Sequence, residues 1–275
     1  MDNCKVIAIT NQKGGVGKTT TTVNLGVGLV SEGYRVLLID ADPQGSLTVS
    51  LGVKNPDDLS VSLASVLQRV IDDRPINEHM GIIQHQEGVD LLPSNIELSG
   101  LEISLFNVMS REFILKGYID EIRKNYDYIL IDCMPSLGMM TVNSLVAADS
   151  VIIPSQPNFL STKGLNLLMH SISKVKRQIN PRLSIDGILL TMVDNRTNNA
   201  KDIISSLRSS MGSNIRVFNT EIPHSVRAAE CSLVGKSIFS HDKNGKVAAA
   251  YENLTKEVSD IGRETQNRSG PDWVR

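Results

Sequence analysis

Residues 11–22 read NQKGGVGKTTTT and follow a short apolar run at residues 5–10. Glycine has no Cβ, so the backbone N–H groups of such a loop can turn inward and approach phosphate oxygens. The next residues have the pattern of a helix over 18–31, whose N-terminus favours negative charge. A glycine-rich loop between a buried strand and a helix predicts a site for the phosphate chain of a nucleotide.

Two side chains of this loop have separate predicted roles. Lys18 is placed to reach the β- and γ-phosphates, and Thr19 is placed to offer its hydroxyl to Mg²⁺. The residues that we expect to contact the nucleotide are Gly14, Gly15, Val16, Gly17, Lys18, Thr19 and Thr20.

Acidic side chains follow two further apolar runs. VLLIDADPQGS at residues 36–46 contains Asp40 and Asp42, and YILIDCMPSLG at residues 128–138 contains Asp132 in the pattern of a Walker B motif. Parallel sheets bind ligands at the carboxyl edge, where these residues are expected. Asp132 can hold the hydration shell of Mg²⁺. Of Asp40 and Asp42, one could orient the metal and the other the attacking water, because two close carboxylates repel without a cation or water between them.

The distribution of apolar residues predicts the fold class. Runs rich in Val, Ile and Leu indicate strands buried on both faces, at residues 5–10, 35–39, 89–92, 128–131, 150–153 and 185–193. Helical patterns lie between or after them, at residues 18–31, 61–71, 97–108, 112–124, 139–147, 165–179, 200–211 and 247–261. This alternation predicts an α/β protein with a doubly wound, mainly parallel sheet flanked by helices. With the glycine-rich loop at residues 11–22 it resembles a P-loop NTPase. We expect a single domain over residues 1–264 and a flexible tail over 265–275.

Composition narrows the class of protein. Of 275 residues, 41% are hydrophobic and 21% charged, which is typical of a globular protein, and the 4% of aromatic residues disfavour a platform for stacking bases. Three dispersed cysteines without a CxxC pair argue against a disulfide framework and a zinc site. Neither a signal peptide nor an apolar run of membrane-spanning length is present in the sequence, so we expect a soluble cytoplasmic protein.

The charge is divided unevenly along the chain. The net charge of −2 combines 12 basic and 19 acidic residues at 1–169 with 16 basic and 11 acidic residues at 170–275. The excess of basic residues in the last third is compatible with chance or with a basic face that meets nucleic acid.

The phosphate loop departs from the usual GxxxxGK[ST] pattern in a specific way. Gln12 stands where the first glycine belongs, and Lys13 precedes the glycine pair. This KGGxGKT form resembles the deviant Walker A motif of the ParA/MinD group of P-loop ATPases. The resemblance implies that ATP with Mg²⁺ is the cofactor and that Lys13 reaches across a nucleotide-sandwich homodimer to the partner's ATP. It further assigns hydrolysis to Asp42 and the metal environment to Asp40.

Within this group the chain looks like the ParA or Soj partition ATPases over about residues 4–262. The matching segments are ITNQKGGVGKTTTTVNL, IDADPQGS, PSQP, LLTMVDNRTN and IPHSVRAAE. The Met134-Pro135 pair stands where relatives have Pro-Pro, and His224 stands where many have Arg. A MinD-like membrane ATPase would need a basic amphipathic C-terminal helix, whereas the helix here carries Glu252 and Glu257. A nitrogenase-iron-protein-like reductase would need two cluster cysteines, and Cys133 has no suitable partner in the middle of the chain.

The resemblance also implies a cycle and further site residues. Arg196 and Arg227 match the positions that bind double-stranded DNA without sequence preference once ATP has closed the dimer, which implies a nucleoid-associated protein. Met192, Asn195 and Pro223 would surround the adenine. Hydrolysis, weak alone and stimulated by a ParB-like centromere-binding protein, would reset the cycle. The same ATPase core also fits a positioning or regulatory ATPase for a different cargo, and the motifs leave both functions open.

Overall fold

The computed structural model describes residues 4–157, 159–194, 203–205, 208–209 and 215–268, with side chains described for these except at 159–163 and 264–268. In this part of the chain, eight strands form one sheet in the order β3-β4-β2-β5-β1-β6-β7-β8. The strands are β1 (Lys5–Ile9), β2 (Val36–Ala41), β3 (Ile83–Gln84), β4 (Asp90–Leu92), β5 (Tyr128–Cys133), β6 (Ser150–Ser155), β7 (Ser184–Val193) and β8 (Val217–Pro223). All neighbours pair in parallel except β3 with β4, which confirms the predicted mainly parallel sheet.

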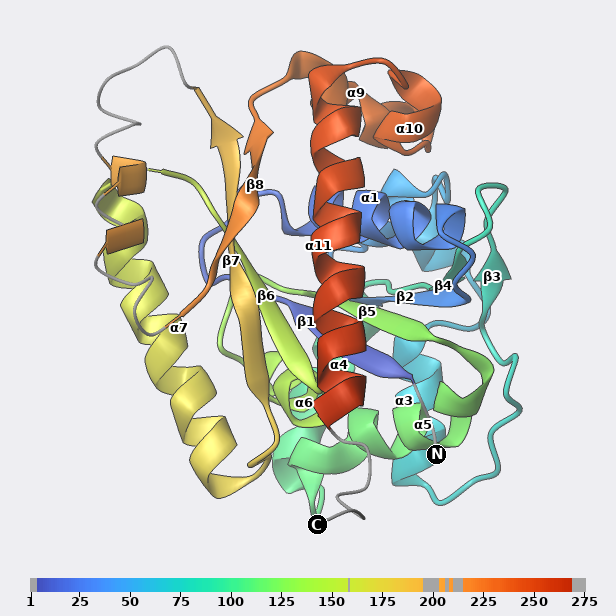
Figure 1. Ribbon diagram of the computed structural model, residues 1–275. Helices are drawn as coiled ribbons and strands as arrows, with labels where there is room; N and C mark the ends of the chain where they lie inside the picture. The colour runs from blue at the N-terminus through green and yellow to red at the C-terminus, as the bar shows by residue number, and fades with distance from the viewer. Residues whose placement is uncertain (1–3, 158, 195–202, 206–207, 210–214, 269–275) are drawn as a thin grey trace.

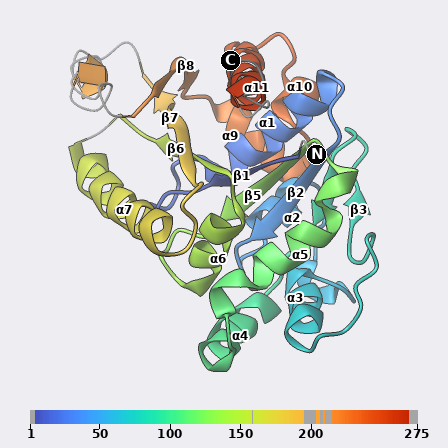
Figure 2. The same cartoon turned by 60° about the horizontal axis from the view of Figure 1, so that its bottom comes forward.

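Helices cover both faces of this sheet (Figures 1 and 2). One face packs against α1 (Lys18–Ser31), α2 (Ser46–Ser50), α9 (Val226–Val234), α10 (Ile238–His241) and α11 (Lys246–Arg268). The other packs against α3 (Leu63–Ile71), α4 (Glu97–Ser104), α5 (Ile114–Ile122), α6 (Met139–Ala147) and α7 (Phe159–Gln178). Among the helices of the described residues, none combines the length and the apolar character that crossing a membrane requires.

The sandwich of helices explains why the central strands are continuously apolar. In β1, Val6 and Ala8 belong to the core on the α3–α7 side, whereas Ile7 and Ile9 belong to the core on the α1–α11 side. Successive side chains of a strand point to opposite faces, so a strand covered on both sides needs apolar residues at every position. All four of these side chains have no exposed surface.

The strand order places the phosphate loop at the centre of the sheet. β1 lies between β5 and β6, and the chain continues to β2 on one side and later to β6 on the other. The loop after β1 therefore lies where the strand order reverses, at the edge where open α/β sheets bind ligands. At this edge Asp132 of β5 is in register with Ile9 of β1 and Asp40 of β2.

The sequence patterns did not indicate several elements at the margins of the fold. β8 reads VFNTEIP and alternates between buried and more exposed positions, because it is the last strand of the described sheet, so it lacks the continuous apolar run of a central strand. The helix α9 exposes Val226, Leu233 and Val234, so its apolar residues do not form a stripe that faces the core. The short elements α2, α10 and β3 carry too few residues for a periodic pattern.

Other boundaries differ by a few residues from the predicted ones. The helix α4 ends at Ser104 and continues as a 3-10 turn (Leu105–Asn107), which corrects the helix predicted over 97–108. The helix α11 runs to Arg268, so the first four residues of the predicted tail are helical, whereas 269–275 lie outside the described residues. Of the helix predicted over 200–211, residues 203–205 and 208–209 are described and are helical.

Candidate nucleotide-binding site

The phosphate loop joins β1 to α1 through two left-handed glycines. Gly15 has φ 69° and Gly17 has φ 83°, conformations that residues with a Cβ adopt only with strain. Gly17 is also the N-cap of α1, and no side chain bonds to the helix end from that position. The first N–H groups of a helix have no intrahelical acceptor, so they are available to an anion here.

Contacts from neighbouring strands hold the loop in this shape. The Asn11 amide donates to the carbonyl of Pro154 at 2.7 Å and accepts from the Lys13 N–H at 3.0 Å. On the other side, the Thr191 hydroxyl donates to the carbonyl of Val16 at 2.8 Å. The loop is therefore fixed to β6 and β7 before any ligand binds, which lowers the entropic cost of binding.

Lys18 extends under the loop and is almost completely buried. Its ammonium donates to the carbonyl of Lys13 at 3.3 Å, and its exposed fraction is 8%. Burial lowers the pKa of Lys18, and the Asp132 carboxylate opposes this effect. A buried cation is costly unless an anion faces it, and the β- and γ-phosphates are the anions that this position suits.

Thr19 and Asp132, both predicted near a metal ion, meet directly. The Thr19 hydroxyl donates to Asp132 Oδ2 at 2.6 Å, and the Thr22 hydroxyl lies 3.4 Å from Oδ1. Burial, together with repulsion from Asp40, raises the pKa of Asp132 to about 8. A buried carboxylate beside a hydroxyl is a donor set that suits Mg²⁺, which binds oxygen ligands and keeps several waters. Thr22, which the sequence analysis missed, belongs to the run of four threonines at residues 19–22.

Mg²⁺ at this position would depend on few protein ligands. Within the described ranges, no group of three or more His, Cys, Asp or Glu side chains converges as a metal site. The Thr19 hydroxyl and Asp132 would therefore act together with phosphate oxygens and water, as is usual for Mg²⁺ that accompanies a nucleotide.

Asp40 is the second-last residue of β2 and Asp42 is the first residue after this strand, and the two have different surroundings. Asp40 is fully buried, and burial raises its pKa to about 6 although hydrogen bonds from Thr48 lower it. Its Oδ1 accepts a hydrogen bond from the Asp42 N–H, and its Oδ2 accepts two from Thr48 of α2. Asp42 is half-buried, and its Oδ1 accepts the Gln44 N–H at 2.9 Å. The metal role of Asp40 and the hydrolytic role of Asp42 stay predictions.

A cavity of about 160 Å³ lies beside the loop and brings together two of the three residues predicted to surround adenine. Gly17, Thr20, Met192, Pro223 and Tyr251 are among its lining residues. Met192 has φ 52°, a strained conformation for a residue with a side chain. Asn195 lies outside the described residues. Tyr251 was missed by the sequence analysis because it belongs to α11, where it fits the apolar stripe of a docked helix.

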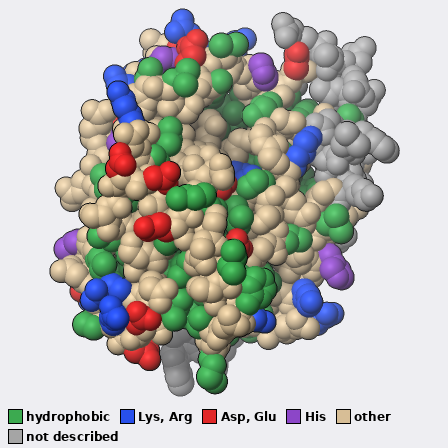
Figure 3. Space-filling view, turned by 180° about the vertical axis from the view of Figure 1, so that it is seen from behind, with side chains coloured by type: hydrophobic (Ala, Val, Ile, Leu, Met, Phe, Trp, Pro, Cys, Tyr) green, Lys and Arg blue, Asp and Glu red, His purple; other side chains and the backbone are tan. Residues whose placement is uncertain are grey.

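Of the two predicted DNA-binding arginines, Arg227 is described and Arg196 lies outside the described residues. Arg227 lies on α9 with its side chain 64% exposed, and its guanidinium is 3.8 Å from the Glu230 carboxylate. His241 also contacts Glu230, at 3.1 Å. On the face opposite α11, Figure 3 shows the Lys and Arg side chains of the described residues scattered rather than gathered into one patch. Arg227 is thus the described residue on which a DNA-binding surface can be tested.

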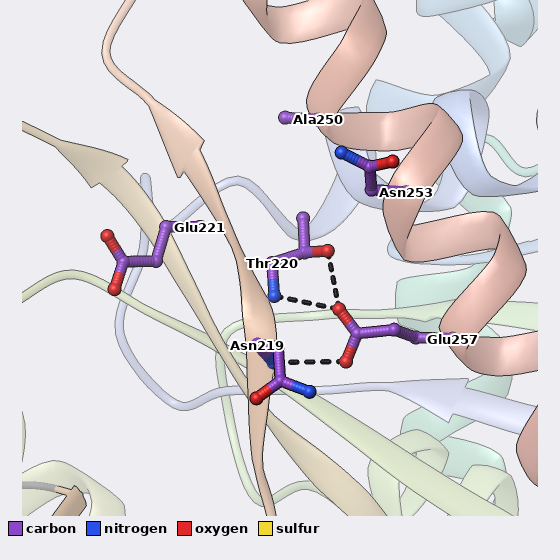
Figure 4. A pocket seen from close by; sticks show the side chains of 6 residues that line it. All are labelled: Asn219, Thr220, Glu221, Ala250, Asn253 and Glu257. Carbon is purple, nitrogen blue, oxygen red and sulfur yellow. Dashed lines mark hydrogen bonds between the residues drawn. The ribbon is translucent and has the colours of Figure 1, made fainter.

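A larger hollow, of about 510 Å³, lies between β8 and α11 and away from the phosphate loop. Figure 4 shows Glu257 of α11 pointing at the backbone of β8, where it accepts hydrogen bonds from the N–H groups of Asn219 and Thr220. Its carboxylate therefore pairs with backbone N–H groups of β8, the last strand of the described sheet, which would otherwise be open to pairing with another chain. Despite its size, this hollow lacks the glycine loop and the buried lysine, and we place the nucleotide at the phosphate loop.

Comparison with known proteins agrees with this geometry. A family described as an AAA domain matches residues 4–185. The sporulation initiation inhibitor protein Soj of Bacillus subtilis is 43% identical over 94% of this chain and 99% of its own. The chromosome partitioning protein ParA of Caulobacter vibrioides is 39% identical over 96% of this chain and 97% of its own.

Solved structures extend the likeness to three dimensions. A cobyrinic acid a,c-diamide synthase from Mycobacterium smegmatis, with bound ADP and magnesium, superposes with a TM-score of 0.81 at 34% identity and covers 99% of this chain and all of its own. A putative plasmid partition protein from Borrelia burgdorferi, bound to AMPPNP, gives a TM-score of 0.76 at 25% identity over 94% and 99% of the two chains. The bound ligands of these neighbours agree with the predicted ATP and Mg²⁺. The chain belongs to the ParA/Soj family of P-loop ATPases.

Proposed function

We propose that this protein is a DNA-partition ATPase. ATP closes a homodimer that binds double-stranded DNA without sequence preference, and hydrolysis stimulated by a ParB-like centromere-binding partner resets it. The observation that carries the ATPase part is the buried Lys18 beside the contact of Thr19 with Asp132. The partition part is supported by the names of the Soj and ParA relatives, which align with nearly the whole chain.

ATP binding follows from the geometry of the phosphate loop. The triphosphate meets the N–H groups at the start of α1 and the Lys18 ammonium, while the adenine enters the cavity lined by Met192 and Pro223. When bound, Mg²⁺ would supply positive charge that neutralises the charge developing during transfer. Thr19 and Asp132 are the residues that would hold it.

Hydrolysis requires a positioned water and additional positive charge at the γ-phosphate. Asp42 is half-buried at the same edge of the sheet and orients the attacking water. Lys13 of the other protomer adds charge only in the closed dimer, so an isolated chain turns over slowly. P-loop ATPases that lack a built-in arginine finger gain roughly 10³–10⁵ in rate when one is supplied, which leaves room for stimulation by a partner.

DNA binding depends on the dimer, which presents two copies of a surface that binds DNA weakly by itself. Arg227 offers a planar guanidinium that suits phosphate, but Glu230 on the same helix reduces its local charge. One such surface holds DNA weakly, whereas two in a dimer neutralise twice the number of phosphates. Affinity rises steeply with that number, so ATP-driven dimerisation switches DNA binding on.

The decisive experiment measures binding to random-sequence duplex DNA with no nucleotide, with ADP and with ATP. The Asp42→Ala variant serves alongside the wild type, because it is expected to bind ATP and dimerise but not to turn over. We expect retention of DNA with ATP alone, at an affinity independent of sequence. Equal binding in all three nucleotide states would contradict the DNA switch and favour an ATPase that positions a different cargo.

A further inference from the structure

The carboxylate of Asp40, near the end of β2, bonds to Thr48 of α2 and so joins the two ends of the loop between them. Asp40 Oδ2 accepts two hydrogen bonds from Thr48, one from its N–H at 2.8 Å and one from its hydroxyl at 2.7 Å. Asp40 Oδ1 accepts a bond from the Asp42 N–H at 3.2 Å. Asp40 and Thr48 have no exposed surface. One buried side chain therefore fixes both ends of the segment from Asp42 to Thr48.

The Thr48 hydroxyl makes a second contact, with the strand next to β2. It accepts the N–H of Ser94, which follows β4, at 3.0 Å. The hydroxyl thus donates to Asp40 and accepts from Ser94 at the same time, which uses its donor and one of its acceptor positions. A Cβ on Gly45 would approach the Ser94 carbonyl to 3.0 Å, so the loop also lies tightly against this segment.

This arrangement controls where Asp42 lies. The backbone of Asp42 is held by Asp40, and the orientation of Asp40 is in turn set by the two bonds from Thr48. The side chain of Asp42 accepts a hydrogen bond within the turn, from the Gln44 N–H. Its position relative to the phosphate loop thus depends on the buried contact between Asp40 and Thr48.

We infer that Thr48 is a positioning residue for ATP hydrolysis, acting through Asp40 on Asp42, and that Asp40 serves chiefly as the anchor of this loop. The inference rests on the proposed ATPase function and adds a residue to it. Thr48 does not line the nucleotide cavity or contact Lys18, so it affects the attacking water and not the affinity for ATP. Small displacements of catalytic groups are costly, since about 1 Å can lower a rate by about 100-fold.

The test compares Thr48→Val with Thr48→Ser in the full-length protein. Valine has the shape of threonine without the hydroxyl, whereas serine keeps both hydrogen bonds. We expect kcat for ATP to fall at least about tenfold in Thr48→Val and to stay within about twofold of wild type in Thr48→Ser. The Kd of a fluorescent ATP analogue should change less than about threefold in either variant.

A matched control comes from a second buried threonine. Thr255 lies on α11 with 2% of its surface exposed, and its hydroxyl donates to the carbonyl of Tyr251. Thr255→Val removes a buried hydroxyl far along the chain from the loop, and we expect kcat to stay at the wild-type value. If Thr48→Val does not fold, Thr48→Cys replaces it, because the thiol takes the place of the hydroxyl but is a weak donor. Thr48→Ser, which also lacks the γ-methyl, is then its direct comparison.

Each outcome decides the inference. A wild-type kcat in Thr48→Val, a similar loss in Thr48→Ser, or a parallel loss of ATP affinity would overturn it, since none of these fits a group that acts only on the hydrolytic step. If the wild-type chain binds ATP but does not hydrolyse it even with DNA and partner present, the proposed ATPase function fails instead.

Discussion

Lys18 and Asp132 illustrate how a ligand site is built at the expense of stability. Lys18 is a buried ammonium and Asp132 a buried carboxylate, and burial disfavours the charged form of each. In the proposed function, the two groups are positioned to meet phosphate and a metal ion, which would offset this cost. Replacing either residue with a neutral one should therefore lower activity without lowering the stability of the nucleotide-free protein.

Lys18→Ala should abolish ATP binding without lowering stability. The ammonium contributes charge-assisted bonds to the β- and γ-phosphates, each of about 1.5–3 kcal/mol, so the loss of both weakens binding by about 10²–10⁴-fold. The melting temperature of the nucleotide-free protein should stay the same or rise, because a buried charge is removed. Calorimetric titration with ATP and thermal denaturation provide the two measurements. Full ATP affinity in the variant would place the phosphates elsewhere.

Asp132→Asn should stabilise the nucleotide-free protein, and more so at higher pH. The pKa of Asp132 is raised to about 8 in the folded protein, so the folded state holds a proton that the unfolded chain loses near its ordinary value. Stability from this group is present at low pH and declines as pH rises toward 8. The advantage of Asn should therefore grow between pH 6 and pH 8 in urea denaturation. The variant should hydrolyse ATP far more slowly.

At the scale of helices and strands, the close contact of α1 with α11 depends on a glycine, Gly28, which has no side chain. A Cβ on Gly28 of α1 would collide with the Thr255 hydroxyl of α11. We expect Gly28→Ala to lower the free energy of unfolding by about 1–3 kcal/mol through overpacking. Gly100 in α4 is the control, since nothing lies within 4 Å of its Cβ position and alanine there should favour the helix. A neutral Gly28→Ala in urea denaturation would contradict close packing of the two helices.

The sequence predicted those elements whose own residues carry the pattern. The strands β1, β2 and β5 are apolar at most positions. β1 leads into the loop with Gly17, and β2 and β5 carry Asp40 and Asp132 as their second-last residues, so both the sheet and the edge at which a ligand is expected were predicted. Thr48 and Thr191 were missed, because a hydroxyl acquires its role only when the fold brings it to Asp40 or to the carbonyl of Val16. Their function follows from spatial neighbours, which a linear pattern does not contain.

At the scale of the whole molecule, the phosphate loop and the helix that carries Arg227 have to act together. The phosphate loop lies at the centre of the sheet, and Arg227 lies on α9, which packs beside α2 and α10 at the top of the view in Figure 1. The cavity beside the phosphate loop has Pro223 of β8 and residues at the start of α9 in its wall, so the proposed nucleotide site and the helix that carries Arg227 share a boundary. This connection agrees with a DNA affinity that depends on the bound nucleotide.

The last prediction concerns Arg227 and the salt dependence of DNA binding. The logarithm of affinity falls by about 0.9 per neutralised phosphate for each tenfold rise in salt, and a dimer presents Arg227 twice. Arg227→Ala should therefore reduce the slope by about 1.8 with ATP bound, while ATP-dependent dimerisation, measured by light scattering, is retained. Arg263→Ala is the matched control, because Arg263 is 63% exposed and also contacts an acidic residue one turn away, Asp260. If both variants keep the wild-type slope, α9 does not meet the DNA; if both lose it equally, binding reflects overall charge and not this surface.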